Sequence, residues 1–307
     1  MKGRIFVVVV LVAAAAFAGR WVNRAVGGNA NGARREETRQ TFKLEAGARV
    51  EVGFINGSVE VKTADTDTAE VHIVRTGSSA EDLEYRRVTV AASPASLVVH
   101  GERNGVPGLW HRIWNGGGEV RQEVTLVLPR RVELAAEHVN GSVNVGDIDG
   151  MVEVSHVNGR VEVAGAAGRA QVSHVNGGVK LGVTRLGEEG MEVEHVNGNV
   201  EIRFTQLVNA DVESEHQNGG FSLNVPNVTM QERMNRSYTR ARLGSGGSPV
   251  RVDHVNGNVR FESDAGPATA AATTASTSDD ESDEADELPP PPPAPPAPPA
   301  PPAPPVR

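Results

Sequence analysis

A four-residue motif that returns along the middle of this chain most constrains what the chain can fold into. His-Val-Asn-Gly occurs five times, and Phe-Ile-Asn-Gly and His-Gln-Asn-Gly are variants of it. The seven asparagines are separated by 84, 18, 18, 21, 21 and 38 residues, and the two wide gaps are four times 21 and twice 19. One period of 18 to 21 residues therefore fits the whole span, which is typical of proteins built from stacked repeats. The asparagines are Asn56, Asn140, Asn158, Asn176, Asn197, Asn218 and Asn256.

Each copy of the motif lies between two segments with strand-like alternation. Val152–His156 before the asparagine and Val161–Val163 after it alternate apolar and polar side chains, and this period of two indicates half-buried strands. The glycine after asparagine tolerates the positive φ that a tight corner needs. Two short strands and two corners account for one period, with an alanine- and glycine-rich stretch such as Ala164–Gly168 as the second corner.

Two all-β architectures fit this pattern. Asn-Gly between alternating strands is a strong hairpin signal, so a meander of antiparallel hairpins is one of them. The other is a parallel, β-helix-like β-solenoid, in which identical residues of successive coils stack about 4.8 Å apart. A meander gains nothing from the identity of the copies. We therefore predict the solenoid, with about eleven coils stacked at this spacing between Val50 and Phe261.

Three segments of the chain resemble a known family. Val124–Pro129, Val132–Leu134 and Asn140–Val145 are similar to the bacterial putative-adhesin β-solenoid family, a domain of unknown function with repeated Asn-Gly or Ser-Gly. The resemblance covers roughly residues 42–261. It implies an exported or membrane-associated protein without established catalytic residues. The uniform histidine of the motif and the proline-rich tail depart from the family pattern, which leaves a metal-related or wall-related specialisation open.

The two ends of the chain differ in composition from the repeats. A basic start, an apolar stretch and Ala16-Phe17-Ala18 predict a cleaved export signal or, if uncleaved, an N-terminal membrane anchor. The tail repeats Pro-Pro-Ala, which predicts a polyproline II spacer or a ligand for a proline-recognising partner. The expected segments are the signal at 1–18, a polar linker at 19–40, the β-solenoid domain at 41–262, a disordered Ala/Thr/Ser-rich and acidic linker at 263–288 and the proline-rich tail at 289–307.

Charge and cysteine content exclude several classes of protein. The net charge is −9, and seven carboxylates lie within Asp279–Glu287, so the rest of the chain is close to neutral. A nucleic-acid-binding surface is not expected from this balance. The chain has no cysteine, which rules out a disulfide framework, a thiol nucleophile and a cysteine-ligated zinc.

Six of the nine histidines belong to the motif. In strict alternation His156 shares a face with Val152 and Val154, which must point into the core, so we expect the imidazoles to be buried, stacked and neutral. Phe54 at the same place in the first copy is consistent with a packed site. If the imidazoles face outward instead, neighbours about 4.8 Å apart could bind a transition metal or sense pH. These candidate ligands are His138, His156, His174, His195, His216 and His254.

The asparagines of the motif predict a second column, a ladder of side-chain amides in which each amide donates to the next coil. A ladder of this kind would have a structural role. Its expected members are Asn140, Asn158, Asn176, Asn197, Asn218 and Asn256.

Charged residues at the outward positions indicate a mixed-charge, solvated face. A carbohydrate-active β-solenoid enzyme would need a carboxylate pair in a groove. No such pair stands out, because acidic residues occupy the alternating outward positions of strands throughout the domain. Trp110, His111 and Trp114 could cap the core or grip a sugar or lipid headgroup. Val228–Leu243 is by default an ordinary insertion, and its arginines favour a short amphipathic helix or an exposed loop against an anionic surface. The outward charges include Glu153, Glu162, Glu192, Glu194, Glu201, Glu213, Lys180, Arg203 and Arg251.

These patterns together predict an exported, non-enzymatic β-solenoid in the periplasm, cell envelope or medium, with an adhesin-like or structural role. The expected partner is a glycan or protein of the envelope or a surface. No cofactor or nucleic acid is expected, and a membrane only through an uncleaved N-terminal segment. The alternatives are a carbohydrate-active enzyme and a metal-binding or pH-sensing protein that uses the histidines.

Overall fold

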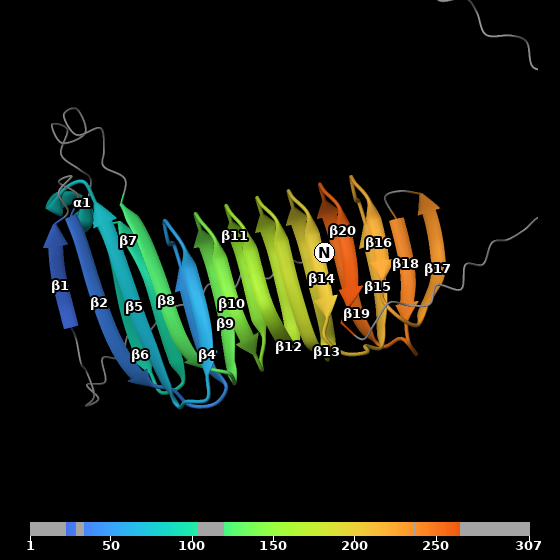
Figure 1. The fold of residues 1–307 in the computed structure, drawn as a ribbon, viewed down its shortest axis with the longest axis horizontal. Coiled ribbons are helices and arrows are strands. Elements are labelled where there is room, and N and C mark those ends of the chain that lie inside the picture. Colours follow the sequence, from blue (N-terminus) through green and yellow to red (C-terminus); the bar gives the residue numbers. More distant parts are fainter. Residues whose placement is uncertain (1–22, 29–33, 104–119, 236–237, 265–307) are drawn as a thin grey trace, which may run out of the picture. The chain divides into compact units, whose positions relative to one another are not determined.

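The computed structural model describes residues 23–28, 34–103, 120–235 and 238–264, all within one compact unit. These residues confirm the all-β class: they form a 20-stranded mixed sheet with one short helix, α1 (Ala80–Tyr85) (Figure 1). No helix among them is both long and apolar enough to span a bilayer. The expected signal segment, the loop with the two tryptophans and the tail lie outside the described residues.

Strands that precede the Asn-Gly corners form one layer. They pair in parallel and in register, so that Val154 lies beside Val172, and Val172 lies beside Val193. β12 and β13 contribute their C-terminal parts to this layer. In order of pairing, the layer contains β7 (Ser96–Arg103), β3 (Ala48–Gly53), β9 (Val132–Val139), β11 (Val152–Val157), β12 (Val161–Val175), β13 (Val179–Val196), β19 (Ser248–Val255) and β15 (Ala210–Glu215).

Strands that follow the corners form the second layer, again parallel and in register. Val143 lies beside Val161, and Val161 lies beside Val179. In order of pairing, this layer contains β8 (Arg121–Pro129), β4 (Val59–Ala64), β10 (Val143–Ile148), the N-terminal parts of β12 and β13, β14 (Val200–Phe204), β20 (Val259–Ser263) and β16 (Phe221–Asn224).

The core lies between the two layers and consists of columns of identical side chains. Val154, Val172 and Val193 are each 0% exposed and come from successive repeats. Burying one valine stabilises a fold by about 1.5–3 kcal/mol. Because a shift of one residue would turn a strand's valines outward, this repeated burial holds the strands in register.

Antiparallel strands cover both ends of the parallel region. At one end β2 (Arg34–Lys43) pairs with β5 (Thr68–Gly77), and β6 (Arg86–Ser93) pairs with β7. β1 (Asn23–Gly28) pairs with β2. At the other end β17 (Val228–Asn235) and β18 (Tyr238–Leu243) form an antiparallel pair beside β15.

These end strands correct three expectations. The folded region begins well before residue 41, because β2 starts at Arg34 and β1 at Asn23. Val228–Asn235 and Tyr238–Leu243 form strands and not a helix or loop. The estimate of about eleven coils at ~4.8 Å spacing is too high, because the described residues hold seven Asn-Gly corners and the first wide gap contains β5, α1, β6, β7 and β8.

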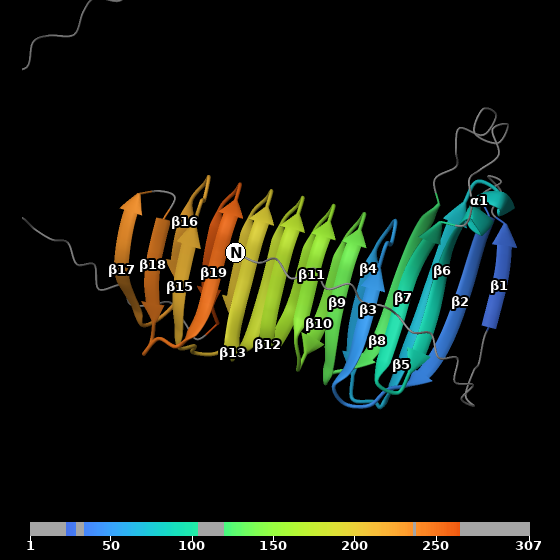
Figure 2. The same ribbon diagram turned by 180° about the vertical axis from the view of Figure 1, so that it is seen from behind.

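The order of the chain and the order of the stack differ near the C-terminal end of the described region. β19 and β20 pair with β13 and β14 on one side and with β15 and β16 on the other. Figure 1 shows the orange β20 between β14 and β16, and Figure 2 shows the orange β19 between β13 and β15. The chain therefore passes over one position, forms β15 to β18, and returns to fill that position.

Candidate functional site

The six motif histidines lie at the ends of strands that lead into the Asn-Gly corners, and all six are exposed. The imidazoles of His138 and His216 are 43% and 63% exposed. The prediction of buried imidazoles is therefore wrong.

The backbone at the histidines explains their outward direction. Each has a positive φ between 46° and 54°, and Phe54 in the first copy has φ 58°. A single residue in the left-handed region interrupts strand alternation, and histidine is one of the residues that tolerates this region best. In the third copy Val154 points inward, His156 turns outward, and Val157 points inward again.

The residue after each histidine belongs to the core. Val157 and Val175 are both 2% exposed, and Ile55 in the first copy is 1% exposed. Gln217 replaces this valine in one copy and is also buried, with its side-chain amide donating to the carbonyl of Gly220 at 2.7 Å. The residue after the histidine is therefore buried in every copy, and the polar side chain of Gln217 is accommodated by its bond to a backbone carbonyl. Strict alternation would instead place this residue outward.

The exposed rings form one continuous stack. Ring centroids of neighbouring histidines are 4.5–4.8 Å apart, and the ring planes meet at 0–16°. Phe54 stacks on His138 at 4.5 Å, and His100 lies against Phe54 at 4.6 Å. We call these eight residues the ring column, whose order is His100, Phe54, His138, His156, His174, His195, His254 and His216.

The charge beside the ring column changes along its length. Glu137 and Glu194 each lie 4.0 Å from the imidazole of the following histidine. Serines take this place before His156 and His174. Partial burial, followed by the charges of His156 and His195, lowers the pKa of His174 below its ordinary value of 6.5. His174 therefore holds a proton less readily than a free imidazole does.

The predicted asparagine residues form a ladder beside the ring column. Each side-chain amide donates to the amide oxygen of the preceding repeat in the stack, at 2.9–3.2 Å. Asn56 starts the ladder and donates to the carbonyl of Val120 at 2.9 Å. The asparagines are exposed from Asn140 onward. In stacking order the ladder is Asn56, Asn140, Asn158, Asn176, Asn197, Asn256 and Asn218.

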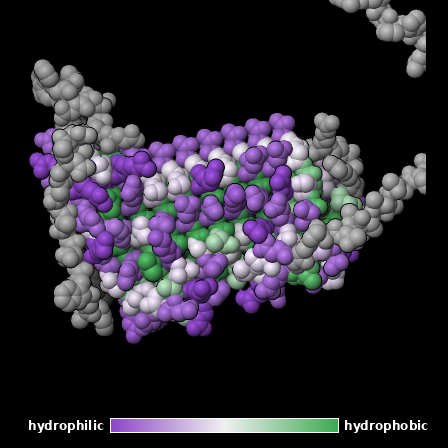
Figure 3. Space-filling view, in the orientation of Figure 1, coloured by the Kyte–Doolittle hydropathy of each residue, from purple (hydrophilic) through white to green (hydrophobic). Residues whose placement is uncertain are grey.

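The glycine after each asparagine lets the corners approach closely. A Cβ on Gly177 would lie 2.2 Å from the carbonyl oxygen of Gly159, and a Cβ on Gly159 would lie 2.2 Å from that of Gly141. No side chain fits at this distance, so glycine is required by the stacking itself. Figure 3 shows the polar character of one long edge, where hydrophilic residues form a continuous row.

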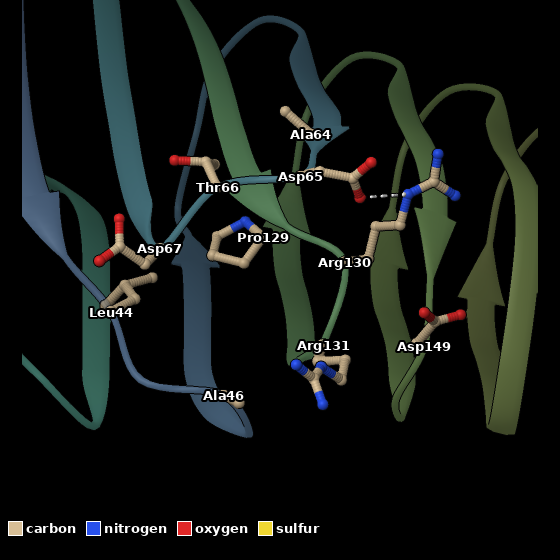
Figure 4. A pocket seen from close by; sticks show the side chains of 10 residues that line it. All are labelled: Leu44, Ala46, Ala64, Asp65, Thr66, Asp67, Pro129, Arg130, Arg131 and Asp149. Carbon is tan, nitrogen blue, oxygen red and sulfur yellow. Dashed lines mark ion pairs between the residues drawn. The ribbon is translucent and has the colours of Figure 1, made fainter.

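A groove of about 650 Å³ lies near the opposite corners (Figure 4). Its carboxylate Asp65 pairs with Arg130 at 3.4 Å, and Arg130 also contacts Asp147 at 3.6 Å. Elsewhere on the strands, burial, followed by hydrogen bonding and charge from Glu194, raises the pKa of Glu192. Neither glutamate lines this groove.

The predicted outward charges lie on exposed or half-buried positions of the strands. Several of them pair across neighbouring strands, as Lys180 does with Glu201 at 3.4 Å and Arg240 with Glu213 at 2.8 Å. Surface pairs of this kind contribute at most about 1 kcal/mol each. They keep the face soluble and provide no isolated charge for chemistry.

Two members of the site were not found from the sequence: His100 lies at one end of the ring column and Asp253 at the other. Phe54 was identified by its place in the motif, but the expected packed site is wrong, because the side chain is 52% exposed. His100 has no motif around it, and it reaches the column only because β7 pairs with β3.

The fold and the site define an all-β protein with columns of side chains along its Asn-Gly corners. No protein-family model matches the sequence, and a search of curated proteins finds no match. Among solved structures, the chain is similar to a putative cell adhesion protein from Clostridium sporogenes, with 10% identity over 74% of this chain and 99% of that chain, at a TM-score of 0.39. It is also similar to a putative adhesin from Bacteroides fragilis, with 10% identity over 74% of this chain and 96% of that chain, at a TM-score of 0.28.

Proposed function

We propose that this chain is an exported, non-enzymatic β-solenoid that acts as an adhesin-like or structural protein of the cell envelope. The observation that carries the proposal is the ring column with its neighbouring asparagine ladder. Two columns of identical groups, repeated every 4.5–4.8 Å, suit a ligand that is itself repetitive. The export signal and the proline-rich tail predicted from the sequence support a location outside the cytoplasm.

The ring column favours contacts through ring edges. Because the faces of the imidazoles stack on one another, their nitrogen atoms are the groups left to meet a partner. Neutral imidazole offers one donor and one acceptor. An extended glycan or a repetitive protein surface can contact several repeats at once, and such multivalent contact increases avidity without strong single contacts.

The test is a binding screen of the mature chain against glycans, peptidoglycan and isolated envelope fractions. We expect a repetitive polymer to bind, and the double variant His156→Asn/His174→Asn to bind it more weakly. Asparagine tolerates positive φ, so the corners should keep their shape. Glu162→Gln, on the layer that follows the corners, is the matched control. Binding that is equal in both variants and the wild type would contradict the role of the ring column.

A second candidate function rests on Glu192 and Glu194. Glu192 has a raised pKa and lies beside Glu194, and glycoside hydrolysis uses one protonated and one ionised carboxyl group. The test is release of reducing ends from envelope polysaccharides, with Glu192→Gln as the variant. Release that depends on Glu192 would replace the adhesin-like function with an enzymatic one.

A further inference from the structure

Three side chains converge where the ring column ends. His216 follows β15, and Asp253 and His254 are neighbours in β19. The two strands pair in parallel with Glu215 beside Asp253, which brings the two histidines together. Nδ1 of His216 lies 2.9 Å from one carboxylate oxygen of Asp253, and Nδ1 of His254 lies 2.9 Å from the other. One carboxylate therefore contacts two imidazoles.

This arrangement differs from the other corners in one chemical detail. Where Glu137 and Glu194 precede a histidine, the carboxylate stays 4.0 Å from the ring. Aspartate is one methylene shorter, and Asp253 lies close to both rings. The last two rings also meet at 16°, whereas the histidine pairs from His138 to His254 meet at 0–4°. The last two rings are thus less nearly parallel than the others, and both contact the carboxylate of Asp253.

We propose that His216, Asp253 and His254 bind a divalent late transition metal such as Zn²⁺ or Ni²⁺. Two imidazole nitrogens and one carboxylate oxygen are ligands that these ions accept. The three candidate ligand atoms already lie within 4.8 Å of one another. An ion at about 2.0–2.2 Å from each ligand atom requires the rings to rotate inward, and both are about half exposed or more, at 63% and 48%.

The protons on the two rings do not prevent binding. In the neutral state each Nδ1 can donate its hydrogen to Asp253. A change of tautomer moves that hydrogen to Nε2 and frees both Nδ1 lone pairs without net loss of a proton. Partial burial by itself would raise the pKa of Asp253, but hydrogen bonding from His216 and the charge of His254 together lower it below its ordinary value. The carboxylate is therefore ionised at neutral pH, as a metal ligand must be.

Binding would link two strands that are distant in the chain. Residues 216 and 254 are 38 positions apart, and the ion would connect the repeat of β15 to the repeat of β19. A ligand that binds only the folded state stabilises it by mass action, so metal should raise the melting temperature. His216 and His254 belong to the ring column, but the polymer test changes His156 and His174 and the metal test changes Asp253, so either proposal can fail without the other.

The experiment uses the mature full chain without a histidine tag. Calorimetric titration with ZnCl₂ and with NiCl₂ at neutral pH should give one ion per chain, and EDTA should lower the melting temperature to its metal-free value. Asp253→Asn should weaken binding by about tenfold or more, as loss of a ligand or of its close support does. Glu194→Gln changes the equivalent position one repeat away and should leave binding unchanged.

Two outcomes would overturn the proposal. One is the absence of any metal-dependent heat or melting shift in the wild type. The other is binding of several ions per chain that survives Asp253→Asn and is lost in His156→Asn/His174→Asn, which would place the metal along the middle of the ring column. If Asp253→Asn fails to fold, His216→Asn at the exposed end of the column tests the same site.

Discussion

The imidazoles of His156 and His174 stack with their centroids 4.8 Å apart and their planes at 3°. Both residues have left-handed backbone, with φ 54° and 53°. A proton on one ring places a positive charge directly against the other. The charge of His156 therefore contributes to lowering the pKa of His174, after the effect of partial burial.

The folded protein should lose stability as pH falls. The pKa of His174 is below 6.5 in the folded state, so the unfolded chain binds a proton first and folding is weakened from about pH 6.5 downward until the folded pKa is passed. Thermal melts from neutral to mildly acidic pH should show this loss, and His174→Asn should show less of it. High salt should reduce the part due to neighbouring charges. A profile identical in wild type and variant would contradict this effect.

The left-handed backbone at the histidines predicts a strong dependence on residue type. His156→Val should destabilise the fold by roughly 1–2 kcal/mol more than His156→Asn, because β-branched side chains clash in this conformation. Both variants lose the stacked ring, so the difference between them isolates the backbone. Urea denaturation measures it. Equal stability of the two variants would mean that the corner changes shape when the histidine is replaced.

The sequence was sufficient for the period, the strands and the asparagine positions, but not for the direction of the histidines. Strict alternation of inward and outward side chains assumes an extended backbone at every residue, including His156. One left-handed residue before each Asn-Gly shifts the count by one, which turns His156 outward and Val157 inward. A signal was present in Ile55 and the repeated valines, whose apolar character is expected for a buried position.

The end strands were harder to predict for a different reason. β2 and β18 contain many charged residues, such as Arg35 and Arg242. β18 pairs with β15, the last parallel strand of its layer, and β2 pairs with β5, which itself pairs with β8. They become strands because each of these neighbours offers unpaired backbone groups, and pairing covers an exposed edge. Such a dependence on tertiary contacts leaves no motif in the local sequence.

Position in the asparagine ladder should determine the effect of losing an amide. Asn176→Ala removes two ladder hydrogen bonds, to Asn158 and from Asn197. Asn218→Ala removes one, to Asn256. Because the amides are exposed and water can replace the lost partners, we expect a loss of about 1 kcal/mol at Asn176 and about half that at Asn218. Chemical denaturation of both variants measures the ratio, and an equal or inverse ratio would argue against a cooperative ladder.

Two adjacent glycines should differ sharply when replaced by alanine. A Cβ at Gly177 meets the carbonyl oxygen of Gly159 at 2.2 Å, whereas a Cβ at Gly178 has its nearest neighbour, the carbonyl oxygen of Asn199, at 3.7 Å. Gly177→Ala should cost about 1–3 kcal/mol or more, as overpacked sites do, and Gly178→Ala should be tolerated. Thermal unfolding distinguishes them. A tolerated Gly177→Ala would show that the corners are not closely stacked.

Two truncations should have opposite results. Removal of residues 265–307 should leave a cooperative β-sheet transition, because that segment lacks core residues. Removal from Ser248 onward also deletes β19 and β20, which lie between β13 and β15 and between β14 and β16. We expect that shorter chain to lose cooperative unfolding, as followed by circular dichroism. A cooperative transition in both truncated chains would show that β13 and β15 can pair directly.

The position of β19 and β20 also determines where this protein can change length during evolution. Between Asn140 and Asn197 the order of the chain equals the order of the stack. Duplication of an 18-residue unit there, such as residues 158–175, begins and ends at the same corner and would lengthen the stack by about 4.8 Å. A unit added after β20 would have no free place in the stack, because β20 already pairs with β14 on one side and with β16 on the other. Relatives with longer or shorter stacks should therefore differ in the middle of the chain, with both ends retained as fixed caps.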